Sequence, residues 1–131
     1  MRLLRKLRST EKPLILAIES SCDDTCLAIL RRDNKLIHEY RASQKRLHQP
    51  FGGVVPQLAS FGHRTSFHKF LGSDLLQSIL RKKQVQFIAV TTGPGIGSCL
   101  STGYEIAHQL SRSNKIPLLP VNHLVKFQII G

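Results

Sequence analysis

The amino-acid sequence predicts an α/β fold in which helices flank a mixed five-stranded sheet. Residues 14–18 form a continuous apolar run that ends in a polar loop, which is typical of a strand buried on both faces. Two more predicted strands follow at once, whereas each of the last two is preceded by a helical pattern. With 131 residues, of which 41% are hydrophobic, the chain is long enough for one domain with a core.

The first three strands are predicted to pair as antiparallel hairpins, because only short turns connect them. Apolar residues over 26–30 predict the second strand, and residues 36–42 predict the third. Between these strands, Asp33 and Asn34 favour a turn. The next segment, 45–53, is predicted to be a loop that is basic at its start and contains paired glycines near its end.

Two helices are predicted before the fourth strand. The first covers 56–71 and begins with proline, which is favoured in the first turn of a helix. It carries His63 and His68, which are five residues apart and share no face, so we expect surface or groove histidines rather than ligands. Ser73 is a good N-cap for the second helix, whose last turn is expected to hold residues 81–83. Its apolar stripe is predicted to consist of Leu75, Leu76, Ile79 and Leu80.

The second half of the chain predicts a strand, a helix and a short last strand. Residues 85–91 predict the fourth strand and residues 117–121 the fifth. Between them, a glycine loop over 92–97 leads into a helix over 98–113. In that helix, Gly103 indicates close contact with the sheet. The stripe of this helix is predicted to consist of Leu100, Gly103, Tyr104, Ala107 and Leu110.

Three polar segments are predicted to converge at one edge of the sheet. Helical crossovers make the fourth and fifth strands parallel to the first, so their carboxyl ends share an edge. The loops 19–25 and 92–98 and the pair 122–123 follow these strand ends. Because open α/β sheets bind ligands outside the carboxyl ends of their strands, we expect a ligand site there.

The loop over 19–25 concentrates more carboxylates and hydroxyls than a turn requires. They belong to Glu19, Asp23 and Asp24, and to Ser20, Ser21 and Thr25. Since Asp23 and Asp24 are adjacent, they point in different directions, so one could orient a ligand while the other accepts a proton. The alternative is a solvated turn after a strand.

The glycine loop and His123 are weaker candidates. The loop over 93–97 precedes a helix, so its amide groups could hold a phosphate or carboxylate. No Gly-Lys-Ser/Thr follows, so it is not a P-loop, and a plain strand-to-helix turn is the alternative. His123 could ligate a metal ion, although a lone histidine is more often structural.

The net charge and the cysteine content restrict which partners and which cellular compartment are expected. The formal net charge is +11, from 19 Lys and Arg against 8 Asp and Glu, which favours a polyanionic partner, nucleic acid first. Three cysteines without a C-x-x-C pair argue against a disulfide framework and a structural zinc site, and favour a reducing compartment. No apolar run approaches the roughly 20 residues of a membrane span, so we expect no membrane partner.

The first 13 residues are predicted to be a basic leader. Residues 1–12 are Arg-rich, contain Ser and Thr, and hold one acid, and Pro13 separates them from the first strand. This composition resembles a mitochondrial transit peptide. We therefore expect a mitochondrial protein, with a simple tail on a cytoplasmic protein as the alternative.

Four short motifs occur in order along the chain. They are Ile18-Glu-Ser-Ser-Cys-Asp-Asp-Thr25, Gly52-Gly-Val-Val-Pro56 with Ala59 and His63, Thr92-Gly-Pro-Gly95, and Pro120-Val-Asn-His-Leu124. Together they resemble the N(6)-L-threonylcarbamoyladenine synthases, also called the glycoprotease family. The likeness extends from about Leu14 to Leu124 and is closer to the bacterial and mitochondrial branch than to the archaeal–eukaryotic one.

This resemblance implies an actin-like ATPase (ribonuclease H-like) fold of two lobes, of which residues 14–124 form the first. It implies transfer of a threonylcarbamoyl group from threonylcarbamoyl-adenylate to the adenosine beside the anticodon of tRNA. On this resemblance the catalytic residues are Asp23 and Asp24. The substrate-binding residues are Ser21, Thr25, Gly93, Gly95 and Gly97. The family uses one divalent metal ion, iron or zinc, for which His123 would be a ligand from a His-x-x-x-His pair.

The sequence departs from the family pattern after Leu124. Phe127 stands where the second histidine belongs, Val125 and Lys126 replace the usual Glu-Gly, and no second lobe follows. We expect 125–131 to be a tail outside the family, and the chain to be truncated, inactive alone and unable to hold the metal stably. The alternative is a non-catalytic partner that forms a homodimer or joins a full-length family member. A metalloprotease ranks last, because no His-Glu-x-x-His is present.

Overall fold

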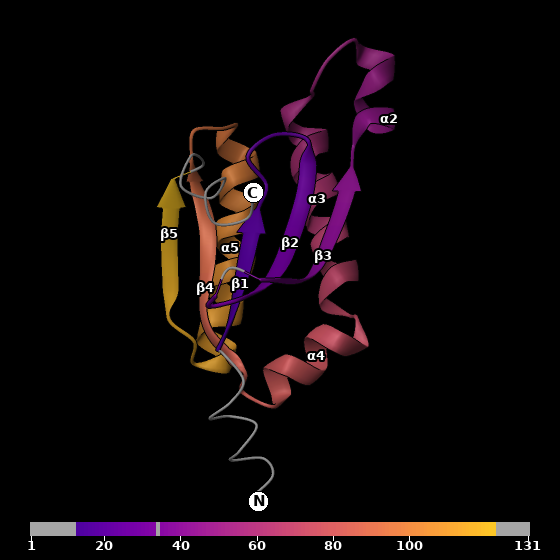
Figure 1. The fold of residues 1–131 in the computed structure, drawn as a ribbon. Helices are drawn as coiled ribbons and strands as arrows, with labels where there is room; N and C mark the ends of the chain where they lie inside the picture. The colour runs from indigo at the N-terminus through magenta and orange to yellow at the C-terminus, as the bar shows by residue number, and fades with distance from the viewer. Residues whose placement is uncertain (1–12, 34, 123–131) are drawn as a thin grey trace, which may run out of the picture.

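The computed structural model describes residues 13–33 and 35–122, which form the predicted mixed five-stranded sheet (Figure 1). The strand order is β3-β2-β1-β4-β5, with the first strand at the centre. The strands are β1 (Leu14–Glu19), β2 (Asp24–Arg31), β3 (Leu36–Ser43), β4 (Val85–Gly93) and β5 (Leu118–Asn122). The predicted mixed sheet of five strands is therefore confirmed.

The strand directions also agree with the prediction from connection lengths. β1 pairs antiparallel with β2, and β2 antiparallel with β3. β1 and β4 are parallel, as are β4 and β5. At the middle of the sheet Ala17 pairs with Ala28 on one side and with Ala89 on the other. Because β1 has a partner along both edges, its backbone is satisfied inside the sheet and its side chains can form an unbroken apolar run.

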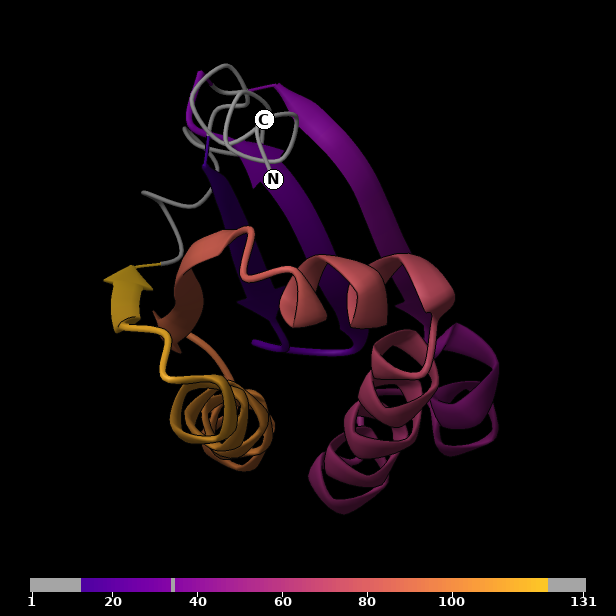
Figure 2. The ribbon, with the colours of Figure 1, turned by 90° about the horizontal axis from the view of Figure 1, so that it is seen from below.

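The longer helices lie on one face of the sheet. They are α3 (Pro56–Leu71), α4 (Asp74–Arg81) and α5 (Gly97–Asn114). Figure 2 shows α3 and α5 side by side beneath the sheet, and Ser60 of α3 shares a hydrogen bond with Thr102 of α5 at 2.7 Å. The short helices α2 (Lys45–His48) and η1 (Gln49–Phe51) follow β3 at the carboxyl end of the sheet (Figure 1).

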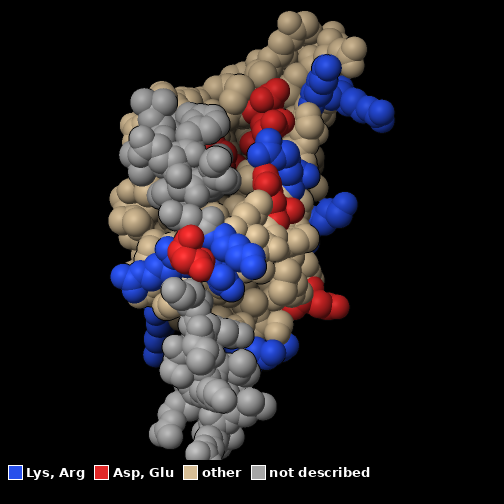
Figure 3. Space-filling model, viewed as in Figure 1, with Lys and Arg blue, Asp and Glu red and all other residues tan. Residues whose placement is uncertain are grey.

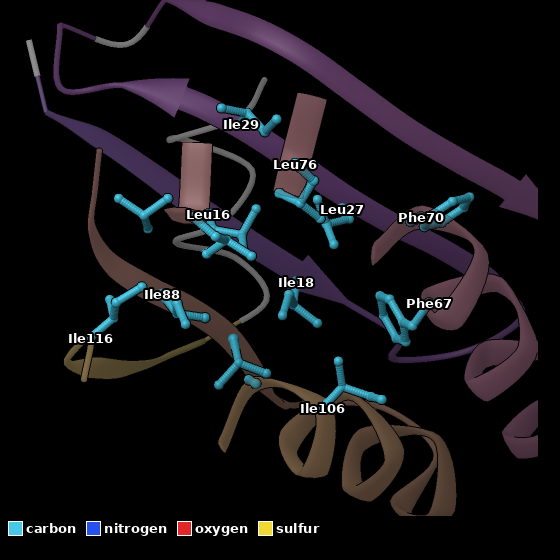
Figure 4. Close-up of a cluster of buried hydrophobic side chains, with 14 of the residues drawn as sticks. Leu16, Ile18, Leu27, Ile29, Phe67, Phe70, Leu76, Ile88, Ile106 and Ile116 are labelled. Carbon is cyan, nitrogen blue, oxygen red and sulfur yellow. The ribbon is translucent and has the colours of Figure 1, made fainter. Parts of the chain in front are cut away.

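The main core fills the space between the sheet and these helices (Figure 4). Alternate residues of the central strands point into it, among them Leu16, Ile18, Leu27, Ile29 and Ile88, and they meet Phe67, Phe70, Leu76 and Ile106 from the helices. The intervening residues face the other side of the sheet, where Ala17, Ala28 and Leu30 form a smaller cluster with Ile15. Within the described residues, no helix is long and apolar enough to span a bilayer.

The structure corrects several predicted boundaries; the strand β4, for example, ends at Gly93 rather than at residue 91. The segment 45–48 is a helical turn rather than a loop, because the amides of Leu47 and His48 bond to the carbonyl of Gln44. The strand β2 begins at Asp24, two residues earlier than predicted, so the connecting loop is only 20–23. α4 ends at Arg81, and the other two basic residues of its end lie beyond the helix.

Each of two predicted helical stripes includes one exposed residue, and the α5 stripe also omits three buried ones. In α4, Leu75 is 40% exposed, and the buried residues are Leu76, Ile79 and Leu80. In α5, Tyr104 is 45% exposed, whereas Cys99, Thr102, Gly103, Ile106 and Ala107 are buried. The reason in α5 is that the helix contacts both the sheet and α3, so its buried surface is wider than one stripe.

Candidate functional site

The carboxyl end of β1 is organised by a buried carboxylate, Glu19. Its Oε1 accepts a hydrogen bond from the amide of Ser21 at 2.5 Å, and its Oε2 accepts one from the hydroxyl of Thr91 at 2.9 Å. Only 6% of Glu19 is exposed, and burying a carboxylate is costly unless it accepts hydrogen bonds. Glu19 therefore fixes the first turn of the loop 20–23 to the end of β4.

The loop 20–23 also packs directly on the glycine loop and on α5. The hydroxyl of Ser20 donates to the carbonyl of Cys99 at 2.7 Å, and the amide of Ile96 donates to the carbonyl of Ser21 at 2.7 Å. A Cβ added to Gly95 would lie 2.6 Å from the Ser21 carbonyl oxygen, and a Cβ added to Gly103 would meet the Ser20 hydroxyl. The predicted convergence of the two loops, and the predicted close approach at Gly103, are confirmed.

His63 of α3 connects the two ends of the segment that carries Asp23 and Asp24. Its Nε2 lies 2.7 Å from the carbonyl oxygen of Cys22, and its Nδ1 lies 2.7 Å from the hydroxyl of Thr25. Since a carbonyl only accepts, Nε2 carries the proton and Nδ1 accepts from Thr25. A single imidazole thus brackets the two aspartates.

The burial of His63 corrects the prediction that it is a surface or groove histidine. It is 0% exposed, whereas His68 is exposed as expected. Burial lowers the pKa of His63 below its ordinary value of 6.5, against the opposite effect of the Cys22 carbonyl and of the carboxylates of Glu19, Asp23 and Asp24. The ring is therefore held neutral, which suits the donor and acceptor pattern of its two hydrogen bonds.

Asp23 and Asp24 have different surroundings. Asp23 is half-buried and borders a pocket of about 320 Å³. The other residues of that pocket belong to α2, η1 and the glycine turn: Lys45, His48, Gln49, Gly52, Gly53 and Val54. Asp24 is exposed at the start of β2. In Figure 3, acidic side chains lie in the upper half of the visible face, with basic side chains beside and between them.

A chain of hydrogen bonds holds the wall of this pocket. The backbone amide of Val55 donates to Nδ1 of His48 at 3.0 Å, and Nε2 of His48 donates to Oε1 of Gln44 at 2.8 Å. Nε2 of Gln44 donates to the carbonyl of Ala59 at 3.1 Å, and the Gln44 amide donates to the carbonyl of Asp23 at 3.2 Å. The wall and Asp23 are therefore positioned by the same buried glutamine.

The remaining predicted site residues lie near this edge or outside the described residues. Gly93 ends β4 and is paired with Asn122 of β5, and Gly97 begins α5. Ser21 and Thr25 are buried with the partners given above. His123 comes directly after Asn122 in the sequence and lies outside the described residues. The roles assigned to these residues stay predictions.

The donor atoms of the described residues do not fit a metal ion. Across 13–33 and 35–122, no three His, Cys, Asp or Glu side chains cluster as ligands would. The exposed thiol of Cys22 has a raised pKa, owing to partial burial and to the charge of Asp23, so it is not an activated nucleophile. Among the described residues, the carboxylates of Asp23 and Asp24 therefore remain the candidate reactive groups.

Sequence reasoning gave His63 no role at this site, although the residue belongs to one of the four motifs, and it missed Gln44 altogether. A signal for His63 was present, because Ala59, His63, Phe67 and Phe70 recur at helical spacing and all four are buried. A polar residue within a buried stripe needs partners, and here it finds them in the loop. For Gln44 no comparable signal exists, since its burial depends on how α2 folds back on α3.

The comparisons with known proteins agree with the resemblance. A family model described as TsaD, tRNA N6-adenosine threonylcarbamoyltransferase, matches residues 35–127. The tRNA N6-adenosine threonylcarbamoyltransferase of Pediococcus pentosaceus is 40% identical over 112 residues, which are 86% of this chain and 32% of the relative. That of Streptococcus suis is 42% identical over 111 residues, 85% of this chain and 33% of the relative. The chain spans about a third of the length of these relatives.

Solved structures share the fold. YeaZ from Pseudomonas aeruginosa matches with a TM-score of 0.58 at 19% identity, over 84% of this chain and 44% of that one. RuvC of T. thermophilus, in complex with a Holliday junction substrate, matches with a TM-score of 0.56 at 10% identity, over 88% of this chain and 68% of that one. The fold is thus the actin-like, ribonuclease H-like one that the resemblance implied.

Proposed function

The chain belongs to the tRNA N6-adenosine threonylcarbamoyltransferase (TsaD) family, and on this premise we propose that it supplies the first lobe of a tRNA-modifying acyltransferase. The reaction transfers a threonylcarbamoyl group from threonylcarbamoyl-adenylate to the adenosine beside the anticodon of tRNA. The observation that carries the proposal is the set of hydrogen bonds on both sides of Asp23 and Asp24. Buried His63 bonds to Cys22 and Thr25, and buried Glu19 accepts from Ser21, so the short loop is held in one conformation.

The chemistry needs a proton acceptor beside the attacking amine. The exocyclic nitrogen of adenosine forms a bond to the carbamoyl carbon, the bond from that carbon to the phosphate oxygen breaks, and AMP leaves. The nitrogen must lose one proton, which a carboxylate can accept. We propose that Asp23 and Asp24 divide this work, one accepting the proton and the other orienting the acyl group.

The pocket beside Asp23 supports this division. Asp23 faces a concave surface that also contains Lys45, whereas Asp24 is open to solvent at the start of β2. A substrate lying along this edge would meet the two carboxylates from different sides. The glycine loop 93–97 lies against the loop 20–23, because the amide of Ile96 donates to the carbonyl of Ser21. This contact supports the proposal that the amide groups of the glycine loop receive the phosphate end of the adenylate.

A chimaera tests the proposal directly. The matching 111 residues of the Streptococcus suis relative are replaced by those of this chain, and the product is assayed for the modified nucleoside with unmodified tRNA and threonylcarbamoyl-adenylate. We expect the chimaera to be active, and Asp23→Asn or Asp24→Asn to lower its rate by about a hundredfold or more. A folded chimaera whose rate is the same with and without both carboxylates would exclude them from the reaction.

The second candidate is a non-catalytic partner subunit. It is favoured by Phe127, which stands where the resemblance implies a histidine. A second chimaera, in which the segment from this chain extends through residue 127, distinguishes the two functions. If Phe127→His restores activity that the Phe127 form lacks, then the chain as it stands is suited to a partner role, and the metal-binding ancestry of the site is supported.

A further inference from the structure

A second pocket lies at the opposite end of the sheet, and its charged lining residues are all basic. It has a volume of about 460 Å³ and lies where α4 and α5 end and β4 begins. Arg81, Lys83 and Lys115 contribute its charge, and Ser113 and Asn114 add polar groups. No aspartate or glutamate is among its lining residues, so its surface attracts anions.

The two lysines of this pocket share an unusual backbone conformation. Lys83 has φ 56° and Lys115 has φ 55°, and across the described residues no other residue except glycine has a positive φ. Each follows the end of a helix, where hydrogen bonds from Gln84 to Ile79 and from Ile116 to Ser111, both 3.0 Å, close the last turn. Glycine is the usual residue at such a position because side chains strain it. Two long cationic side chains therefore stand where local structure favours none.

Neither packing nor ion pairing explains these side chains. Lys83 and Lys115 are exposed. The ion pairs found among the described residues are Arg31–Asp33, Arg41–Glu39 and Arg64–Glu105, and none of them involves this pocket. Lys82 and Arg112, which are next to lining residues in the sequence, are exposed as well. Three cations line the pocket and no acidic residue balances them there, which favours a polyanion with several charges over a single small anion.

We propose that this pocket binds the phosphodiester backbone of RNA, with Lys83, Lys115 and Arg81 each facing phosphate groups. The proposal rests on the proposed function in one respect, since it takes the RNA to be the tRNA substrate. The nine-residue strand β4 separates the pocket from the candidate site by about 30 Å. A folded RNA can span that length, so the pocket would hold the tRNA body while the anticodon region reaches the opposite edge.

The test uses the 131-residue chain and an unmodified tRNA transcript. Fluorescence anisotropy at several KCl concentrations compares the parent with the double variant Lys83→Asn, Lys115→Asn. Asparagine tolerates a positive φ better than lysine, so the melting temperature should not fall. The matched control is Arg32→Gln, Lys35→Gln, which removes two exposed charges at the β2–β3 turn. A third variant, Lys83→Arg with Lys115→Arg, keeps the charge.

We expect the asparagine pair to raise the Kd for tRNA about tenfold and to reduce the slope of log K against log salt by about 1.5. The control pair should change the Kd by less than about threefold, and the arginine pair should bind like the parent. Equal losses in the asparagine pair and the control would overturn the proposal.

A second arm separates RNA from small phosphates. Inorganic phosphate and AMP are titrated into the labelled chain while the amide signals of Lys83 and Lys115 are followed by NMR. Saturation by either at low millimolar concentration, with tRNA binding unchanged in the asparagine pair, would overturn RNA as the ligand. These assays need no acyl transfer, so an inactive chimaera with a tenfold loss here would remove the proposed function and leave RNA binding in place.

Discussion

At the scale of single residues, His63 decides how the two aspartates are presented. Its bond to the Cys22 carbonyl is its one hydrogen bond to the loop, whereas Thr25 is already held by the β2 ladder. A glutamine amide reaches the place of Nε2, and the shorter asparagine amide reaches only that of Nδ1. The two amides are alike in polarity, so a difference between them reports on positioning.

We therefore predict that His63→Gln and His63→Asn differ in their kcat when they are made in the chimaera. His63→Gln should keep kcat within about threefold, and His63→Asn should lose tenfold to about a hundredfold, because a misplaced acid–base group reacts slowly. The KM for tRNA should stay unchanged in both. Melting curves serve as the control, and identical losses in two equally stable variants would mean that His63 only fills space.

His63 also predicts how stability depends on pH. Since its pKa is lowered in the folded chain, the unfolded chain binds more protons below pH 6.5, and stability falls as the pH drops below that value. His63→Gln should flatten this dependence between about pH 6.5 and 5. Urea midpoints at pH 7.5, 6.5 and 5.5 measure it. His68→Gln, which changes an exposed histidine of the same helix, should keep the slope of the parent.

At the scale of elements, the contact of α2 with α3 depends on one glycine. A Cβ on Gly62 would lie 2.7 Å from the side chain of Gln44, which is buried and held at both ends of its amide. Gly62 lies inside α3, where glycine normally lowers helix stability. The helix therefore accepts a weaker residue so that the pocket wall can lie against it.

We predict that Gly62→Ala destabilises the chain by about 1–2 kcal/mol, although alanine favours a helix by about 1 kcal/mol. In a Gln44→Ala background the obstacle is gone, so the same substitution should stabilise. Urea unfolding of the parent, of Gly62→Ala, of Gln44→Ala and of the double variant measures this reversal in the sign of the stability change. Gly72→Ala at the end of α3, where a Cβ meets only ordinary contacts at 3.5 Å, is the control and should change little. A uniform gain from Gly62→Ala would contradict the clash.

The sequence predicted the elements because connection lengths and apolar runs are local features. Short turns made β1, β2 and β3 antiparallel, and the crossovers made β4 and β5 parallel. The exposed side of α5 was not predictable from one stripe, because Ser60 and Arg64 of α3 contact a second face of it. The burial of His63 likewise depends on a loop 41 positions away, which helical spacing indicates only as a buried stripe.

At the scale of the whole molecule, the basic leader carries a prediction that lies outside the described residues. Residues 1–12 should direct a fused fluorescent reporter to mitochondria, because an Arg-rich, acid-poor segment suits import. Confocal images of cells expressing the fusion, with Arg2, Arg5 and Arg8 changed to Gln as the control, measure it. Cytosolic fluorescence from the unaltered fusion would support the cytoplasmic alternative.

The central position of β1 has a consequence for synthesis of the chain on the ribosome. The hairpins of β1, β2 and β3 can form early, but β1 can pair with β4 only when β4 emerges. The hydrogen bond from Thr91 to Glu19 likewise forms only after 72 more residues have been added. Until then an apolar strand presents an unpaired edge, which is a template for joining other chains. The strand that organises the finished sheet is therefore open to misassembly during translation, until β4 is made.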